Sequence, residues 1–98
     1  MMPEQFALCV VFHVRPEHVD EFASRVGDNI AETHKDAGVV FFKYHKVAGE
    51  PTWILYEIWE SERHSDLHRQ KPDVREFFAQ SSRLLAREPE IYRLEPSM

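Results

Sequence analysis

The chain has 98 residues, of which 43% are hydrophobic and 30% charged, and its formal net charge is −5. This composition is typical of one globular domain, so residues 1–98 are interpreted as a single domain. The acidic balance argues against binding to nucleic acid or to an anionic membrane surface. A single cysteine, Cys9, excludes an intrachain disulfide framework. With neither a signal peptide nor an apolar run of about 20 residues, a cytoplasmic protein is expected.

The first half of the chain predicts a strand, a helix and a second strand. Residues 5–14 are β-branched and aromatic and stop before Pro16, which indicates a strand with two largely apolar faces. Residues 16–37 predict a helix, because Pro16 suits its first turn and apolar residues recur at spacings of three and four. Gly38 is a natural stop for this helix. Residues 39–47 predict the second strand.

The second half begins with a strand predicted over residues 52–60, which a turn at 48–51 joins to the preceding strand as a hairpin. Ser61 is expected to cap a short helix that reaches about residue 70, where Pro72 interrupts it. Asp73 is expected to cap a longer helix, with Glu76 at the capping-box position and Pro89 after its end. Residues 91–94 predict a short last strand.

This order of elements, β-α-β-β-α-β, predicts an α+β, ferredoxin-like fold with an antiparallel sheet and both helices on one face. The other sheet face then carries apolar side chains from every strand, and the chain has seven Phe, three Tyr and two Trp. Packing this face against the same face of a second copy would remove it from water. We therefore expect a homodimer that forms through the sheet faces.

Two polar residues fall on predicted apolar faces. Asn29 lies at the edge of the helix stripe, either as a rim amide bonded to backbone or water, or as a group that faces a cavity. Glu57 shares a strand face with Trp53 and Trp59, where a carboxylate must be paired, protonated or solvated. Glu57 is therefore interpreted either as the partner of Arg93 in an ion pair or as a catalytic acid. Trp59 is either a core residue or a substrate platform.

The six histidines offer one candidate of interest. His64 and His68 are spaced i, i+4, but a metal site needs a third ligand and no such cluster is visible, so no metal is expected. His68 follows Leu67 and could point inward as a general base or donor, or be a satisfied structural histidine. The three isolated glycines give no phosphate-binding loop, so no nucleotide or flavin cofactor is expected.

Three further side chains are given structural roles. Tyr44 and Tyr56 lie on paired strands and are interpreted as core or dimer-interface residues. Cys9 is in the middle of a strand, is expected to be buried, and lacks a clear activating partner for nucleophilic chemistry.

Four short stretches of the chain form a recognisable series: Val-Arg-Pro at 14–16, Asp-Glu-Phe at 20–22, Leu-Tyr-Glu-Ile-Trp-Glu-Ser at 55–61 followed by His68, and Glu-Pro-Glu at 88–90. Together they resemble the antibiotic biosynthesis monooxygenase (ABM) domain family, and its quinol monooxygenase-like branch in particular. The resemblance implies a dimeric α+β barrel with a pocket in each subunit between the sheet and the helices. Family members catalyse different reactions, so the fold alone does not fix the activity.

The resemblance also implies site residues. Asn29 matches the polar residue of the first helix, Trp59 the strand tryptophan, His68 the helical histidine, and Glu57 a carboxylate common in the quinol-type branch. We interpret these four as the catalytic site. Trp59 would form an aromatic wall, Asn29 would hydrogen-bond a substrate oxygen, His68 would be the base or an orienting donor, and Glu57 would tune either of them.

The leading interpretation is a cofactor-independent monooxygenase of an electron-rich aromatic, a quinol or polyphenol, with molecular oxygen as co-substrate. Haem degradation is not expected, because Phe77 and Phe78 stand where haem-degrading relatives carry a ligand histidine. The alternatives are an isomerase of a small metabolite, including a phosphorylated one, and a non-catalytic dimeric protein that binds small molecules or serves in stress.

Overall fold

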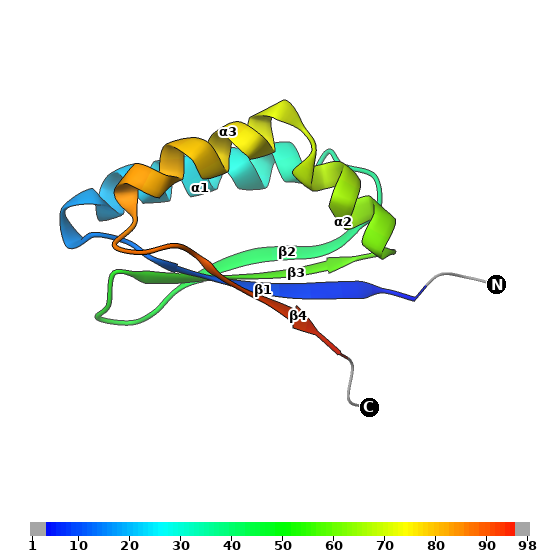
Figure 1. Cartoon of the computed structure of the whole chain (residues 1–98), viewed down its shortest axis with the longest axis horizontal. Coiled ribbons are helices and arrows are strands. Elements are labelled where there is room, and N and C mark those ends of the chain that lie inside the picture. The colour runs from blue at the N-terminus through cyan, green and yellow to red at the C-terminus, as the bar shows by residue number, and fades with distance from the viewer. Residues whose placement is uncertain (1–3, 96–98) are drawn as a thin grey trace.

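The computed structural model describes residues 4–95 and has two layers, a sheet and a set of helices on one of its faces (Figure 1). The sheet is antiparallel with the strand order β2-β3-β1-β4, and its strands are β1 (Phe6–His13), β2 (Val39–Lys46), β3 (Thr52–Trp59) and β4 (Glu90–Leu94). The helices are α1 (Val19–Thr33), α2 (Glu62–Arg69) and α3 (Pro72–Ser81). The predicted ferredoxin-like α+β fold is confirmed.

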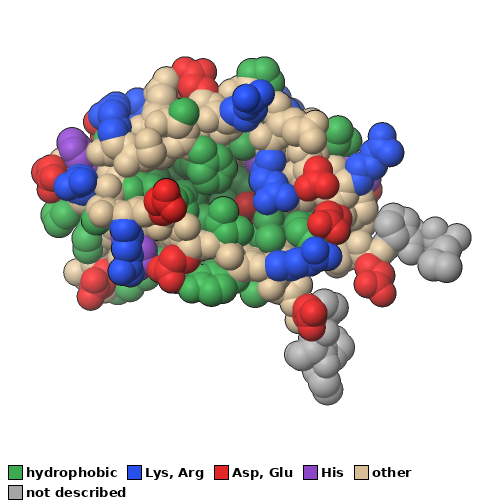
Figure 2. All heavy atoms as spheres, viewed as in Figure 1, with side chains coloured by type: hydrophobic (Ala, Val, Ile, Leu, Met, Phe, Trp, Pro, Cys, Tyr) green, Lys and Arg blue, Asp and Glu red, His purple; other side chains and the backbone are tan. Residues whose placement is uncertain are grey.

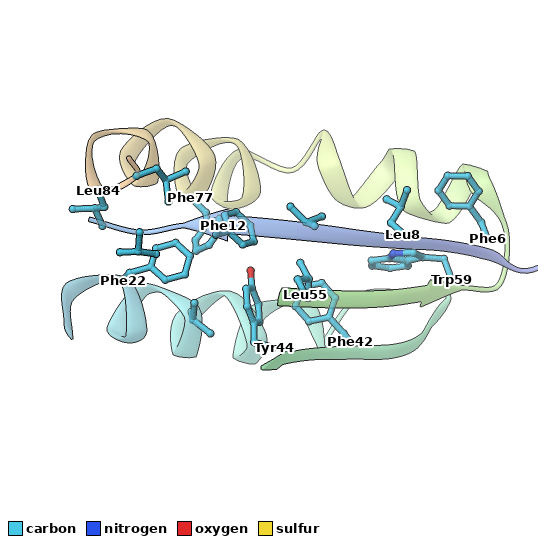
Figure 3. Packing of buried hydrophobic residues seen from close by; sticks show 14 residues of the cluster. Phe6, Leu8, Phe12, Phe22, Phe42, Tyr44, Leu55, Trp59, Phe77 and Leu84 are labelled. Carbon is cyan, nitrogen blue, oxygen red and sulfur yellow. The ribbon is translucent and has the colours of Figure 1, made fainter. Parts of the chain in front are cut away.

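The core lies between the two layers and is rich in aromatic rings. Residues of β1 alternate between buried and half-buried, because successive side chains of a strand point to opposite faces. The ring of Phe12 lies 5.3 Å from that of Phe22 in α1 and 6.3 Å from that of Phe77 in α3. Figure 3 shows these three rings at one end of the core and Trp59 toward the other end. The aromatic cluster therefore fixes α1 and α3 over the sheet, while α2 covers the end that contains Trp59.

The helix predicted over residues 16–37 is shorter in the structure. Residues Pro16–His18 form a 3₁₀ turn and α1 ends at Thr33, because the chain must reverse before it enters β2. Gly38 makes the reversal possible with a φ of +83°, and its carbonyl accepts a hydrogen bond of 2.8 Å from the backbone N–H of Glu60. Residues 34–38 are thus a connection and not part of the helix.

The two short helices meet at Pro72, as predicted, but the expected cap of the second is wrong. Lys71 occupies the N-cap position of α3 without a side-chain cap bond, and Pro72 is in the first turn. Asp73 therefore lies inside the helix, because proline has no N–H to satisfy at that position and can begin the helix itself. Ser61 does cap α2, where its Oγ accepts a hydrogen bond of 3.3 Å from the backbone N–H of His64.

The sheet face away from the helices is uncovered in the single chain. It exposes large apolar side chains from three strands, among them Phe41, Tyr56, Tyr92 and Leu94. Cys9 lies on this face and is half-buried, which corrects the expectation that it is buried, and this partial burial raises the pKa of its thiol. Within residues 4–95, no helix has both the length and the apolar character that a membrane crossing requires.

Candidate active site

A hollow between the sheet and the helix layer has a cavity volume of about 20 Å³, or about 360 Å³ when the open space at its mouth is counted. Figure 2 shows a recess lined by hydrophobic side chains between the two layers, with charged groups around its rim. The apolar lining comes from every strand and from α3, and consists of Leu8, Val10, Phe42, Leu55, Phe78 and Ile91. Four buried polar residues, Asn29, Tyr44, Glu57 and His68, complete the lining together with Arg69 at its edge.

Asn29 enters the hollow from α1 and is oriented by Tyr44 of β2. The Tyr44 hydroxyl donates a hydrogen bond of 2.8 Å to Asn29 Oδ1. Burial, with the nearby charge of Glu57, raises the pKa of Tyr44 well above its ordinary value, so the phenol remains a donor. In the described part of the chain this is the hydrogen bond that the amide makes, which leaves the Asn29 NH₂ group as a donor for a ligand.

Glu57 is buried on the helix-facing side of β3. Its Oε1 accepts a hydrogen bond of 2.8 Å from Nε1 of Trp59, two residues further along the strand. Burial raises the pKa of Glu57, although the Trp59 hydrogen bond and the charges of His68 and Arg69 oppose the shift. Glu57 therefore keeps its proton to a higher pH than an exposed glutamate and can either donate or accept a hydrogen bond.

The predicted alternative, an ion pair of Glu57 with Arg93, is wrong. Both residues flank Leu8 of β1, Glu57 from β3 and Arg93 from β4, so the middle strand separates them. Arg93 instead bonds the exposed carboxylate of Glu62, at 3.3 Å, and its guanidinium lies 4.8 Å from the centre of the Phe6 ring.

His68 points inward from α2 and is fixed on three sides. Its Nδ1 lies 2.6 Å from Oδ2 of Asp36, and its ring centre lies 4.7 Å from that of Trp59 and 5.8 Å from that of Phe42. The other oxygen of Asp36 accepts a hydrogen bond from Nζ of Lys71. This hydrogen bond is the main reason that the pKa of Lys71 is raised. A carboxylate, an imidazole and an ammonium thus form one chain of hydrogen bonds beside the hollow.

Trp59 does not line the hollow, and this corrects the aromatic wall predicted for it. Its side chain is fully buried behind Glu57 and His68, because the indole packs under the imidazole and donates its N–H to the carboxylate. Phe42 and Phe78 supply aromatic wall in its place. Trp59 can act on a ligand only through the two polar residues that it positions.

The structure brings together three of the four residues predicted for the site, Asn29, Glu57 and His68, in the lining of one hollow. Sequence reasoning missed Asp36 and the contact of Lys71 with it, and gave Tyr44 only a structural role. No local signal marks Asp36, since its partners His68 and Lys71 are 32 and 35 positions away.

His64 and His68, the pair considered for a metal, have separate partners. Nδ1 of His64 lies 2.8 Å from Oγ of Ser61, whereas Nδ1 of His68 is bonded to Asp36. Across residues 4–95, no group of three or more His, Cys, Asp or Glu side chains has an arrangement that could hold a metal ion.

Comparison with known proteins gives one family and a set of similar structures. The family model described as antibiotic biosynthesis monooxygenase (ABM) matches residues 6–80. A conserved protein of Methanosarcina mazei Go1 is 26% identical, with a TM-score of 0.88 over 93% of this chain and 91% of that one. Rv0793 of Mycobacterium tuberculosis is 24% identical, with a TM-score of 0.89 over 95% of each chain.

A third structure, described as an antibiotic biosynthesis monooxygenase, is 10% identical, with a TM-score of 0.90 over 95% of this chain and 99% of that one. The comparison with curated proteins gives no match. At these identities the similar structures establish the fold, while the family model establishes kinship over most of the chain.

Proposed function

The chain belongs to the antibiotic biosynthesis monooxygenase family, and on this premise we propose that it oxidises an electron-rich aromatic, a quinol or polyphenol, with molecular oxygen as co-substrate and no cofactor. The observation that carries the proposal is the position of the Asn29 amide, the Glu57 carboxyl and the His68 imidazole in one apolar hollow. The chemistry of a phenol suits this combination of groups, because its ring calls for apolar walls and its oxygen calls for a base and a donor.

The substrate supplies the electrons in this reaction. Removal of a phenolic proton gives an anion that can transfer an electron to oxygen, and a new C–O bond then forms between the two radicals. For a quinol the balance is one quinol and one O₂ giving one hydroxyquinone and one water. One oxygen atom enters the ring, the other leaves as water, and all four electrons come from the substrate.

The protein has three tasks in this scheme. His68 accepts the phenolic proton, and the Asn29 NH₂ group hydrogen-bonds the oxygen on which the negative charge develops. The Glu57 carboxyl places either a neutral group or a negative charge beside the His68 imidazole, depending on whether the carboxyl is protonated. The apolar walls, Leu8, Val10 and Leu55 among them, keep bulk water from the anion and its radical.

The proposal includes a homodimer formed through the uncovered sheet face. Phe41, Tyr56, Tyr92 and Leu94 expose between 37% and 48% of their surface on this face, an arrangement that favours burial against another protein surface. A second copy presents an equally apolar face, and a two-fold axis would match the two.

The test is oxygen uptake by purified, metal-stripped protein with a panel of quinols and polyphenols. Because quinols autoxidise, the control is the Asn29→Ala, His68→Ala double variant, with its folding checked by circular dichroism. We expect uptake by the wild-type protein to exceed this control, and His68→Ala alone to lower kcat/KM by about 10²-fold or more through loss of the base.

The same panel is incubated without oxygen to separate the alternatives. Product formed anaerobically would contradict the oxygenase and indicate an isomerase. A tightly bound compound that is recovered unchanged from aerobic incubation, with no uptake above the control, would indicate a binding protein.

A further inference from the structure

Asp36 occupies a position in which it can control the chemistry of His68. It lies in the connection between α1 and β2, and its side chain is only 10% exposed. Its two carboxylate oxygens are divided between two partners: Oδ2 is 2.6 Å from Nδ1 of His68, and Oδ1 accepts a hydrogen bond from Lys71. The Lys71 ammonium supplies the counter-charge that a nearly buried carboxylate requires.

A carboxylate is an acceptor only, so the His68 nitrogen that faces it must carry the proton. In the neutral imidazole the other nitrogen, Nε2, then has the free lone pair. Among residues 4–95 the imidazole makes its hydrogen bond at Nδ1, which leaves Nε2 for a ligand in the hollow that His68 lines.

From this geometry we infer that Asp36 is a positioning residue that fixes His68 in the Nδ1–H tautomer, so that Nε2 is the base, and that Lys71 fixes the orientation of Asp36. The inference rests on the proposed function for the role of Nε2 toward substrate. The tautomer itself is a property of the free protein and is measured without any substrate.

The key variant is Asp36→Asn, which keeps the shape and removes the charge. Lys71 is a donor only, so the amide oxygen of the variant turns toward Lys71 and its NH₂ group toward Nδ1 of His68. The amide then donates where the carboxylate accepted, and the proton of the neutral imidazole moves to Nε2. The variant would fold with the wrong nitrogen available to the substrate.

A matched double variant separates this effect from a loss of packing. In Asp36→Asn combined with Lys71→Met, no ammonium holds the amide oxygen, so both orientations of the amide are open and part of the imidazole population regains the Nδ1–H tautomer. If Asp36 had only a structural role, the double variant would differ from wild type more than the single variant does, because it loses one more hydrogen bond.

The measurement is a long-range ¹H–¹⁵N correlation spectrum of the full chain labelled with ¹⁵N-histidine, at a pH where the imidazole is neutral. The His68 signals are assigned from their loss in His68→Gln. We expect a protonated Nδ1 and an unprotonated Nε2 in the wild-type protein, exchange of these two signatures in Asp36→Asn, and a partial return of the wild-type signatures in the double variant.

An unprotonated Nδ1 in the wild-type spectrum would overturn the inference even if no variant folded, and so would a tautomer that Asp36→Asn leaves unchanged. Where turnover is found, Asp36→Asn should lower kcat by about 10²-fold or more with little change in KM. Absence of turnover would count against the proposed function and leave the tautomer result valid.

Discussion

At the scale of single residues, the candidate site contains a glutamate, Glu57, whose burial costs stability at neutral pH. Glu57 is 6% exposed, and the pKa of its carboxyl is raised above the ordinary value mainly by burial. The folded state therefore holds the proton more tightly than the unfolded chain does, whose glutamates titrate near about 4.3. Stability from this group is fully present below the unfolded pKa and is lost as the pH rises through the folded pKa.

Glu57→Gln should remove this dependence, because glutamine is neutral at every pH and its oxygen can still accept the Trp59 hydrogen bond. We expect the stability of the variant, relative to wild type, to increase between pH 4 and pH 7.5. Urea unfolding at both pH values measures the difference, and Glu60→Gln, at an exposed neighbour, controls for the loss of one negative charge. A relative stability that is flat or falls with pH would contradict the assigned shift.

Sequence reasoning singled out the candidate-site residues that violate a local pattern and missed those that do not. Asn29 stands out on an apolar helix face and Glu57 on an apolar strand face, so periodicity alone draws attention to them. Asp36 is an ordinary polar residue in a connection, and only the tertiary fold brings it to His68. Trp59 shows the converse, because its position in the strand pattern reveals that it is buried but not whether it faces the hollow or lies behind the His68 imidazole.

At the scale of elements, the strands and their order along the chain could be predicted, because strand patterns are local signals. The ends of helices depend on neighbouring elements and are harder to predict. The connection from α1 to β2 is the clearest case. Gly38, at φ +83°, lies against α2, and a Cβ placed on it would come within 2.3 Å of the His64 ring. His64 in turn hydrogen-bonds Ser61, the N-cap residue of α2. Gly38 therefore lies where the α1–β2 connection packs against α2.

Gly38→Ala should therefore cost more than Gly49→Ala, which is the matched control. Gly49 also has a positive φ, +76°, but a Cβ there meets nothing within 4 Å. We expect Gly49→Ala to lower the free energy of unfolding by about 1–2 kcal/mol through backbone strain alone. Gly38→Ala should lower the free energy of unfolding by about 1–3 kcal/mol more than Gly49→Ala does, because the His64 ring must move. Equal losses in urea unfolding would show that the contact with α2 is unimportant.

At the scale of the whole molecule, the two sheet faces have different roles. The face toward the helices provides the hollow, whose floor comes from strands and whose polar groups come from both layers. The opposite face carries the apolar surface of the single chain. Because the same strands serve both faces, the strands that form the floor of the hollow would also form the interface of the proposed homodimer.

The proposed homodimer gives a test at this scale. Tyr56 is 37% exposed at the centre of the uncovered face and lies 5.3 Å, ring to ring, from Phe41, whereas Leu67 is 51% exposed on α2 in the helix layer. Tyr56→Asp would place an unpaired charge inside the interface, and each 1.4 kcal/mol so lost raises the dissociation constant about tenfold. We expect light scattering during size-exclusion chromatography to give a dimer for wild type and for Leu67→Asp, and a monomer for Tyr56→Asp. A monomeric wild-type protein at tens of micromolar would contradict the proposed homodimer, and dimers of both variants would place its interface elsewhere.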